Sequence, residues 1–309
     1  MNSDNAASGF DPAPARLTVG IVSAGRVGSA LGAALERAGH IVFGVCAISD
    51  ASVRRAETRL PESEILPVEQ VAARSELLLL AVPDTELPGL VRGLAGAGVV
   101  RPGTLVAHTS GANGVGVLAP LAEIGAVPLA IHPAMTFTGH DEDVPRLGNA
   151  CFGITAADEV GYAIAQSLVI EMGGEPVRVR EAERSLYHAA LAHGSNHLVT
   201  VIVDAVAALR AALDGPGLIG QQLVDDQPGG LAERLLAPLA SAALDNALRR
   251  GQSALTGPVA RGEADAVAAH LDALSSVDPR LAAAYRALSL RTAERAGTAP
   301  AVIELLEGH

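Results

Sequence analysis

The first half of the chain alternates short apolar runs with alanine-rich amphipathic segments, whereas the second half carries almost only helical patterns. Most of the apolar runs lack polar alternation, which is typical of parallel strands covered on both faces. The pattern predicts strands over residues 18–22, 41–47, 77–82, 104–108, 127–131, 151–154 and 176–179. It predicts helices between them over residues 27–38, 51–59, 68–74, 88–96, 115–124 and 159–172. This alternation predicts an α/β fold with a doubly wound sheet.

The strands stop near residue 181, and this change marks a predicted domain boundary. Long helices are expected beyond it, over residues 183–213, 231–250, 263–274 and 279–295, with Gly251 and Gly297 as stops. The segment 214–230 is rich in Gly, Pro and Asp and is expected to form a loop between two helices. The prediction is a disordered tail (1–16), an α/β domain (17–181) and an all-α C-terminal domain (182–309).

Composition narrows the classes of function. The net charge of −12 over 309 residues offers no basic stripe for a phosphate backbone, so nucleic acid is not an expected partner. Apolar runs such as residues 77–82 are far shorter than the roughly 20 residues of a membrane-spanning helix, so neither a membrane-spanning segment nor a membrane partner is expected. The polar N-terminal tail has no basic start and no apolar stretch of signal-peptide length, so a cytoplasmic protein is expected. Cys46 and Cys151 lie in apolar runs typical of buried thiols, and neither a disulfide nor a cysteine metal site is expected.

The first chemical motif is the turn between the first predicted strand and the first predicted helix. It reads Ser23, Ala24, Gly25, Arg26, Val27, Gly28. Strand, small-residue turn and helix form the context of the Gly-x-Gly-x-x-Gly fingerprint, in which backbone amides hold a pyrophosphate at the helix N-terminus. Ser23 stands where the first glycine belongs. The motif predicts dinucleotide binding, and the alternative is an ordinary turn between a strand and a helix.

Cofactor choice is expected at the end of the second strand, roughly 20 residues past the motif. Ser49, followed by Arg54 and Arg55, is suited to grip a 2′-phosphate, which favours NADP, while NAD stays possible. Asp50 comes slightly late for the acid that binds the ribose of NAD. Its alternative role is the N-cap of the helix from residue 51.

Small and polar groups follow three further strands, and ligands of such sheets lie beyond the carboxyl ends of the strands. Val82 and Pro83 follow one strand, and Ser110 and Gly111 follow the next; all four are expected to line the cofactor. His132 follows a third strand and is suited to protonate a substrate oxygen, because imidazole titrates near neutrality. A histidine that only fixes a loop is the alternative.

The long helix from residue 183 carries a polar face. At about 100° per residue, one face holds His193, Asn196, His197, Thr200 and Asp204. Amide and imidazole groups of this kind can orient a carbonyl substrate, although a stripe that merely faces water fits the pattern too. The two histidines at i and i+4 have no glutamate between them in the zincin arrangement, and no metal is expected.

A last motif, residues 255–263, joins two predicted helices by a sharp turn. Arg261 is suited to hold a substrate carboxylate, and Thr256 to orient the substrate. The alternative is turn chemistry alone, with Arg261 paired to an acidic residue.

Together these motifs resemble the Rossmann-like proteins that carry a C-terminal helical domain of unknown function 2520. The resemblance covers about residues 17–294 and rests on the turn at 24–28, on 82–84, 108–111, 132–137, 187–190 and 195–196, and on the turn at 256–262. It implies an NADP-dependent oxidoreductase related in design to ketopantoate and pyrroline-carboxylate reductases. Ketopantoate reductases of this design use a lysine of the helical domain, whereas this chain contains no lysine, so Asn196 and a histidine would have to replace it.

The working hypothesis is a reductase of a small polar carbonyl or imine metabolite, for example a keto acid of the ketopantoate type. Asn196 and Thr256 orient the substrate, His132 or His193 protonates it, and Arg261 holds its carboxylate. Two alternatives remain open: a non-catalytic dinucleotide-binding sensor or scaffold, and a cofactor-free structural protein. The long apolar helices of the second domain also predict a homodimer.

Overall fold

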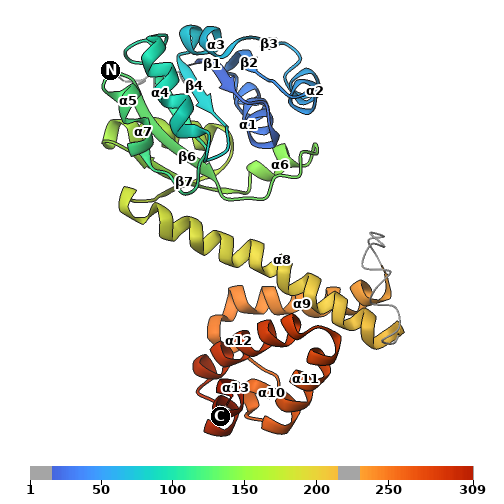
Figure 1. Cartoon of the computed structure of the whole chain (residues 1–309). Coiled ribbons are helices and arrows are strands. Elements are labelled where there is room, and N and C mark those ends of the chain that lie inside the picture. Colours follow the sequence, from blue (N-terminus) through green and yellow to red (C-terminus); the bar gives the residue numbers. More distant parts are fainter. Residues whose placement is uncertain (1–15, 215–229, 309) are drawn as a thin grey trace, which may run out of the picture. The chain divides into compact units, whose positions relative to one another are not determined.

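The computed structural model describes residues 16–214 and 230–308, and the chain divides after Ala192 into two compact units. The first unit contains a sheet with the strand order β3-β2-β1-β4-β5-β6-β7-β8 (Figure 1). The strands are β1 (Thr18–Val22), β2 (Ile41–Cys46), β3 (Glu64–Ile65), β4 (Leu77–Leu80), β5 (Leu105–His108), β6 (Val127–Pro133), β7 (Cys151–Ala156) and β8 (Glu175–Arg178). The order reverses between β1 and β4, which is the switch point where ligands of such sheets bind.

Helices cover both faces of this sheet. They are α1 (Arg26–Arg37), α2 (Asp50–Arg59), α3 (Val68–Arg74), α4 (Leu87–Ala97), α5 (Ala119–Ala122), α6 (Asp143–Leu147) and α7 (Glu159–Glu171), with 3-10 turns η1 (Val115–Leu118) and η2 (Glu181–Glu183). Leu77 and Leu79 of β4 pack into one core, and Leu78 and Leu80 into the other, so the strand is buried on both faces. The predicted doubly wound fold is therefore confirmed.

The sheet departs from a fully parallel arrangement at β7, which runs antiparallel to β6. The connection between these strands does not cross the sheet: Ala134 donates to the Cys151 carbonyl at 2.9 Å, and α6 packs near α1. Because the connection starts and finishes at the same end of the strands, β7 has to run in the direction opposite to β6. The apolar pattern contains no information on strand direction, so the sequence did not show this.

Helix α8 (Arg184–Asp214) begins in the first unit and continues into the second. The second unit adds α9 (Leu231–Arg250), η3 (Gly251–Ala254), α10 (Pro258–Arg261), α11 (Ala264–Val277), α12 (Pro279–Ala296) and α13 (Pro300–Glu307). The predicted helical region is confirmed, although α10 and α13 were not predicted as helices. Residues 1–15 and 215–229, where the tail and the long loop were expected, lie outside the described residues.

The continuous apolar runs give no candidate membrane span, whereas the average hydropathy of a whole helix gives one. Among the residues that the structure describes, one helix, Glu181–Leu213, is long and apolar enough by length and composition alone. The argument from continuous runs missed it because scattered polar residues interrupt the helix while its average stays apolar. The expected cytoplasmic location stays a prediction.

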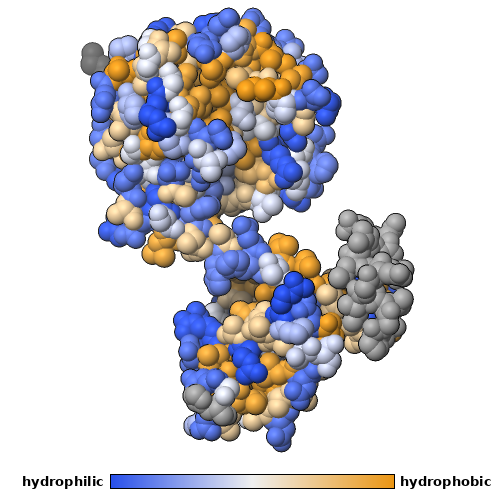
Figure 2. Space-filling view, in the orientation of Figure 1, coloured by the Kyte–Doolittle hydropathy of each residue, from blue (hydrophilic) through white to orange (hydrophobic). Residues whose placement is uncertain are grey.

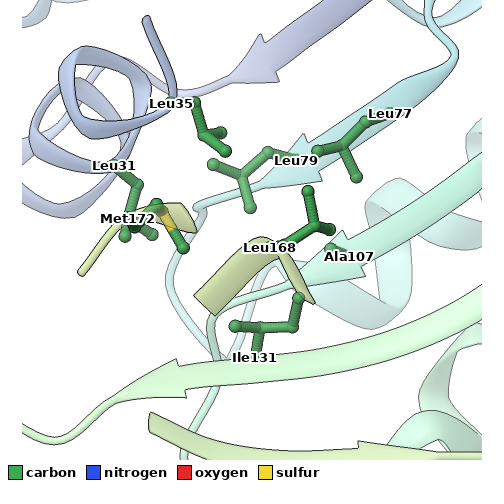
Figure 3. A pocket seen from close by; sticks show the side chains of 8 residues that line it. All are labelled: Leu31, Leu35, Leu77, Leu79, Ala107, Ile131, Leu168 and Met172. Carbon is green, nitrogen blue, oxygen red and sulfur yellow. The ribbon is translucent and has the colours of Figure 1, made fainter. Parts of the chain in front are cut away.

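The core between α1, α7 and the sheet encloses a cavity of about 20 Å³ (Figure 3). Its lining is entirely apolar: Leu31, Leu35, Leu77, Leu79, Ala107, Ile131, Leu168 and Met172. A space of this size holds about one water molecule, but it offers that water no polar partner. The cavity is therefore a packing defect in the core and has no role in the candidate site below.

Candidate functional site

The turn after β1 has the geometry that a dinucleotide fingerprint requires. The Ser23 amide donates to the Cys46 carbonyl at 2.9 Å, which ties the turn to the end of β2. Gly25 is the N-cap of α1, and no side chain caps this helix. The first amides of α1 therefore remain available to bind an anion, and the helix dipole favours negative charge at this end.

Gly28 lets α1 pack closely against the turn and the sheet. A Cβ atom at this position would lie 2.1 Å from the Ser23 carbonyl oxygen and 3.0 Å from the Ala81 Cβ. The backbone oxygen cannot move aside without rebuilding the turn, so a side chain is excluded here. This is the role of the third glycine of the fingerprint. Buried Ala24 and half-buried Val27 pack into the core beside it.

Ser23 is the single non-glycine residue in the described part of the chain with a positive φ, at 78°. An L-residue in the left-handed region costs roughly 1–2 kcal/mol relative to the right-handed one, and glycine avoids this cost. We expect Ser23→Gly to raise the free energy of unfolding of the ligand-free protein by about 1 kcal/mol, seen as a melting temperature a few degrees higher. Ser23→Ala keeps the Cβ and is the control. Equal melting temperatures for the two variants would show that Ser23 is not strained.

Helix α2, which follows β2, carries the basic side chains that the sequence singled out. Ser49 accepts from the Ser52 amide at 3.2 Å and is the N-cap of α2. The suggestion that Asp50 caps this helix is therefore wrong: α2 begins one residue earlier, and Asp50 is its first residue. Arg54 is exposed, whereas Arg55 is half-buried, and its Nη1 donates to the Ala51 carbonyl at 3.2 Å.

Arg26 and Arg55 come together at the loop that follows β6. A Cβ atom on Gly139 would lie 3.4 Å from the Arg26 Cγ and 3.7 Å from the Arg55 Nε. Arg26 was expected at the site only as part of the turn; the structure brings its side chain to the same place as Arg55. The buried carboxylate of Asp143 fixes this loop, because it accepts a hydrogen bond from the Gly139 amide at 2.7 Å.

Beyond β5, His108 shapes the loop that carries the predicted residues Ser110 and Gly111. Its Nδ1 accepts from the Ser110 amide at 3.2 Å, so Nε2 carries the proton and donates to the Gly114 carbonyl at 2.9 Å. Burial lowers the pKa of His108 to about 4, which keeps the ring neutral. The Ser110 hydroxyl accepts from the Asn113 amide at 3.0 Å. His108 is thus a loop-fixing histidine.

His132 lies near the carboxyl end of β6 and faces this loop. Its Nδ1 is 2.9 Å from the Tyr187 hydroxyl. A Cβ on Gly111 would lie 2.9 Å from the His132 Nε2 and 2.8 Å from the His188 Cδ2, so glycine is required for this close approach. Burial, and then the charge of Arg184, lower the pKa of His132 to about 4. At neutral pH the ring is therefore an uncharged hydrogen-bonding group.

The structure thus brings two predicted residues, His132 and Gly111, into contact. Tyr187 and His188, in the first turns of α8, were not predicted as site residues. Both belonged to a motif of the resemblance, but one histidine and one tyrosine on an amphipathic helix carry no signal that separates a site from ordinary packing.

Two family models match the chain. One, described as a Rossmann-like domain, matches residues 1–133, and the other, a domain of unknown function (DUF2520), matches residues 150–292. The chain is a Rossmann-like protein with a DUF2520 domain. His132 lies in the Rossmann-like match and Tyr187 in the DUF2520 match, so their hydrogen bond joins the two matched regions within the first unit.

Solved structures share this architecture at low sequence identity. A proposed NADP oxidoreductase from Bacteroides fragilis is 19% identical, with a TM-score of 0.71 over 90% of this chain and 98% of that one. A Thermotoga maritima protein is 20% identical, with a TM-score of 0.62 over 91% and 98%. A reductive aminase from Aspergillus terreus is 17% identical, with a TM-score of 0.61 over 94% and 98%. These likenesses show the fold. No curated protein matches the chain.

Val82 and Pro83 of the Rossmann-like domain follow β4, which ends at Leu80, two residues earlier than predicted. Val82 is half-buried and Pro83 is exposed. Both lie at the switch point, next to the turn after β1, because Ala81 donates to the Val22 carbonyl at 3.0 Å. Their contact with a cofactor stays a prediction.

In the DUF2520 domain, the predicted polar residues of α8 from His193 to Thr200 are exposed, and so are the apolar residues Leu198 and Val199 of the same stretch. The Nδ1 atoms of His193 and His197 lie 2.8 Å apart, and the Asn196 Oδ1 accepts from the Ser195 hydroxyl at 3.1 Å. The predicted grouping on one face is present. The roles of His193 and Asn196 toward a substrate stay predictions.

Arg261 and Thr256 are both exposed at the turn around α10. The Arg261 Nε donates to a Glu263 carboxylate oxygen at 2.6 Å, and Nη2 donates to the other oxygen at 3.2 Å. This geometry matches the ion-pair alternative for Arg261. To hold a substrate carboxylate, Arg261 would first have to release Glu263.

Proposed function

We propose that the chain is an NADP-dependent reductase of a small polar carbonyl or imine metabolite. The observation that carries this is the turn at the switch point, where Gly28 lets α1 pack tightly against the turn and the first amides of α1 have no side-chain cap, so that they can bind a pyrophosphate. The fold supports it as well. Structures with this fold include the Aspergillus terreus reductive aminase in complex with NADPH, which is 18% identical with a TM-score of 0.54. They also include a pyrroline carboxylate reductase from Plasmodium falciparum with NADP bound that is 12% identical with a TM-score of 0.52.

The residues around the turn suit the parts of NADP in order. The amides after Gly25 bind the pyrophosphate, and Arg26 and Arg55, with Ser49 and Arg54 beside them, bind the 2′-phosphate. Val82, Pro83, Ser110 and Gly111 line the path to the nicotinamide, which supplies the hydride when bound. His132, or His193 as the alternative, gives a proton to the substrate oxygen or nitrogen. Asn196 and Thr256 are proposed to orient the substrate, and Arg261 to hold its carboxylate.

The test is a pair of titrations of the purified chain with NADPH and NADH, followed by nicotinamide fluorescence and by melting temperature. We expect NADPH to bind at least about tenfold more tightly, because charge-assisted hydrogen bonds to the 2′-phosphate contribute about 1.5–3 kcal/mol. Arg55→Gln removes most of this preference and leaves NADH affinity unchanged. Arg92→Gln, an exposed arginine on α4, is the control.

Two results would contradict the proposal. Binding of neither cofactor at millimolar concentration would favour the cofactor-free structural alternative. Tight binding of NADPH with no turnover of any carbonyl or cyclic imine would favour the sensor or scaffold.

We also propose that a second copy of the chain covers the apolar surface of α8 and α9. Large side chains are exposed there, among them Val199 (63%), Val203 (60%), Leu239 (69%) and Leu248 (80%). Figure 2 shows apolar side chains at the surface of the second unit. Extended apolar surfaces of this kind mark interfaces. Light scattering should give the mass of a dimer, and Val203→Asp should shift it toward the monomer; a monomeric wild type would refute the proposal.

A further inference from the structure

Arg184, the first residue of α8, is a buried cation that forms no salt bridge among the described residues; the carboxylate of Glu181 acts on it only as a nearby charge. It is 1% exposed. Its Nε donates to the Thr155 hydroxyl at 2.7 Å, and its Nη2 donates to the carbonyls of Ala130 and Gly153 at 3.1 Å each. All three acceptors are neutral, and within the described residues its buried Nη1 has no hydrogen-bond partner. A buried charge of this kind is costly unless something compensates it.

One turn further along α8, Tyr187 lies between this cation and His132. The Arg184 guanidinium carbon is 5.8 Å from the centre of the Tyr187 ring. The Tyr187 hydroxyl is 2.9 Å from the His132 Nδ1, and the two rings are perpendicular. A Cβ on Gly153 would lie 2.6 Å from that hydroxyl, so the tyrosine ring packs directly against the backbone of Gly153. Gly153 on β7 is the register partner of His132 on β6, and this pairing fixes the distance between the His132 ring and the Tyr187 hydroxyl.

The protonation of this pair sets the direction of its hydrogen bond. Burial raises the pKa of Tyr187, so its hydroxyl keeps its proton, while the His132 ring is neutral as shown above. A hydrogen bond from the Gly153 amide to the tyrosine oxygen lowers the pKa of Tyr187, but burial outweighs this effect. The hydroxyl then donates to Nδ1, and the single ring proton of His132 sits on Nε2, which lies over Gly111.

We propose that Tyr187 and His132 form a proton relay in which buried Arg184 compensates the negative charge that appears on the tyrosine. The proposal rests on the reductase function above. As hydride adds to the carbon of the C=O or C=N bond, the π electron pair moves to the oxygen or nitrogen, which takes the Nε2 proton of His132. The Tyr187 O–H bond breaks as the Nδ1–H bond forms. The imidazole thus changes tautomer, and a tyrosinate is left beside Arg184 until a solvent proton binds Nε2 and the Nδ1 proton returns to the tyrosinate.

The relay explains why no carboxylate in the described part of the chain pairs with buried Arg184, because a permanent partner would cancel the charge that the tyrosinate needs. The other charged or titratable groups that act on His132 are His188 on the same helix, His108 from β5 and Asp84 after β4. Asp84 favours the imidazolium and the other two oppose it, so the neutral ring does not depend on Arg184 alone.

The decisive test reads the tautomer in the full-length chain by NMR of ¹⁵N-histidine, and it needs no substrate. The His132 signals are assigned by their loss in His132→Gln. We expect a neutral Nε2–H tautomer between pH 5 and 8, and a mixture of tautomers in Tyr187→Phe. The control is Tyr285→Phe, because Tyr285 makes the same hydrogen bond at 2.9 Å to His270 in the second unit. An Nδ1–H tautomer or an imidazolium at pH 7 would overturn the proposal.

A kinetic test separates the relay from a structural role. With NADPH and either 1-pyrroline or pyruvate, Tyr187→Phe should lower kcat about 10²–10³-fold with unchanged NADPH affinity. A proton inventory, which is kcat measured in mixtures of H2O and D2O, should show two transferred protons in the wild type and one in Tyr187→Phe. Arg184→Lys should retain more activity than Arg184→Met. An unchanged proton inventory in Tyr187→Phe would refute the relay. Failure of the wild type to bind NADPH would instead refute the reductase function. The NMR result would then still show whether Tyr187 donates a hydrogen bond to His132.

Discussion

Asp143→Ala is expected to lower the free energy of unfolding by about 3–5 kcal/mol, because it leaves a buried arginine without its counter-charge. The Asp143 side chain is fully buried, and its nearest cation is the Arg59 Nη1 at 4.0 Å, on a side chain that is only 7% exposed. The carboxylate also accepts from the Thr138 amide at 3.0 Å, the Thr138 hydroxyl at 2.9 Å and the Gly139 amide at 2.7 Å. Urea unfolding measures the loss. The control is Asp245→Ala, which breaks an exposed ion pair with Arg249 and should cost less than about 1 kcal/mol.

The same carboxylate predicts a pH dependence. Burial by itself raises the pKa of Asp143, but the hydrogen bonds from Thr138 and Gly139 and the charge of Arg59 outweigh it, and the net pKa is lowered. A folded-state pKa below the unfolded value of about 3.9 gives stability that is present above that value and lost as pH falls through the folded pKa. Below about pH 4 the wild type should therefore lose stability that Asp143→Asn never had. Parallel acid-unfolding curves for the two proteins would contradict this.

The sequence predicted those parts of the fold whose signal is local. Strands such as β1 and β5 matched to within a residue because they are buried on both faces and read as continuous apolar runs. The two-residue strand β3 escaped because it is exposed and carries Glu64, and so has no apolar pattern. The direction of β7 depends on where the preceding connection runs, which is a tertiary property.

The candidate site divides in the same way. The turn from Ser23 to Gly28 could be read directly because its function follows from backbone geometry within six residues. His132 could be read from its place at a strand end, but its partner Tyr187 lies 55 residues later. Arg184 follows a charged stretch and looks like an exposed helix start; it is buried because carbonyls of β6 and β7 accept its hydrogen bonds. Such long-range partners cannot be deduced from one sequence.

The fingerprint itself predicts the largest effect on cofactor binding. Gly28→Ala should lower NADPH affinity at least about 100-fold and destabilise the chain by about 1–3 kcal/mol, because its Cβ would meet the Ser23 carbonyl oxygen at 2.1 Å. The measurement is an NADPH titration together with thermal unfolding. Gly93→Ala is the control: it lies exposed within α4 with nothing within 4 Å of its Cβ, and should stabilise by about 0.5–1 kcal/mol.

A second substitution on the same turn separates lost binding from lost folding. A Cβ on Gly25 would meet only the Ser23 Oγ, at 3.4 Å, which is an ordinary contact. Gly25→Ala should therefore fold with a nearly unchanged melting temperature, yet its methyl group stands at the uncapped start of α1, where the pyrophosphate must approach the backbone. We expect weaker NADPH binding without loss of stability. If both glycine variants bound NADPH like the wild type, the turn would not be the cofactor site, and the dinucleotide function would have to be abandoned.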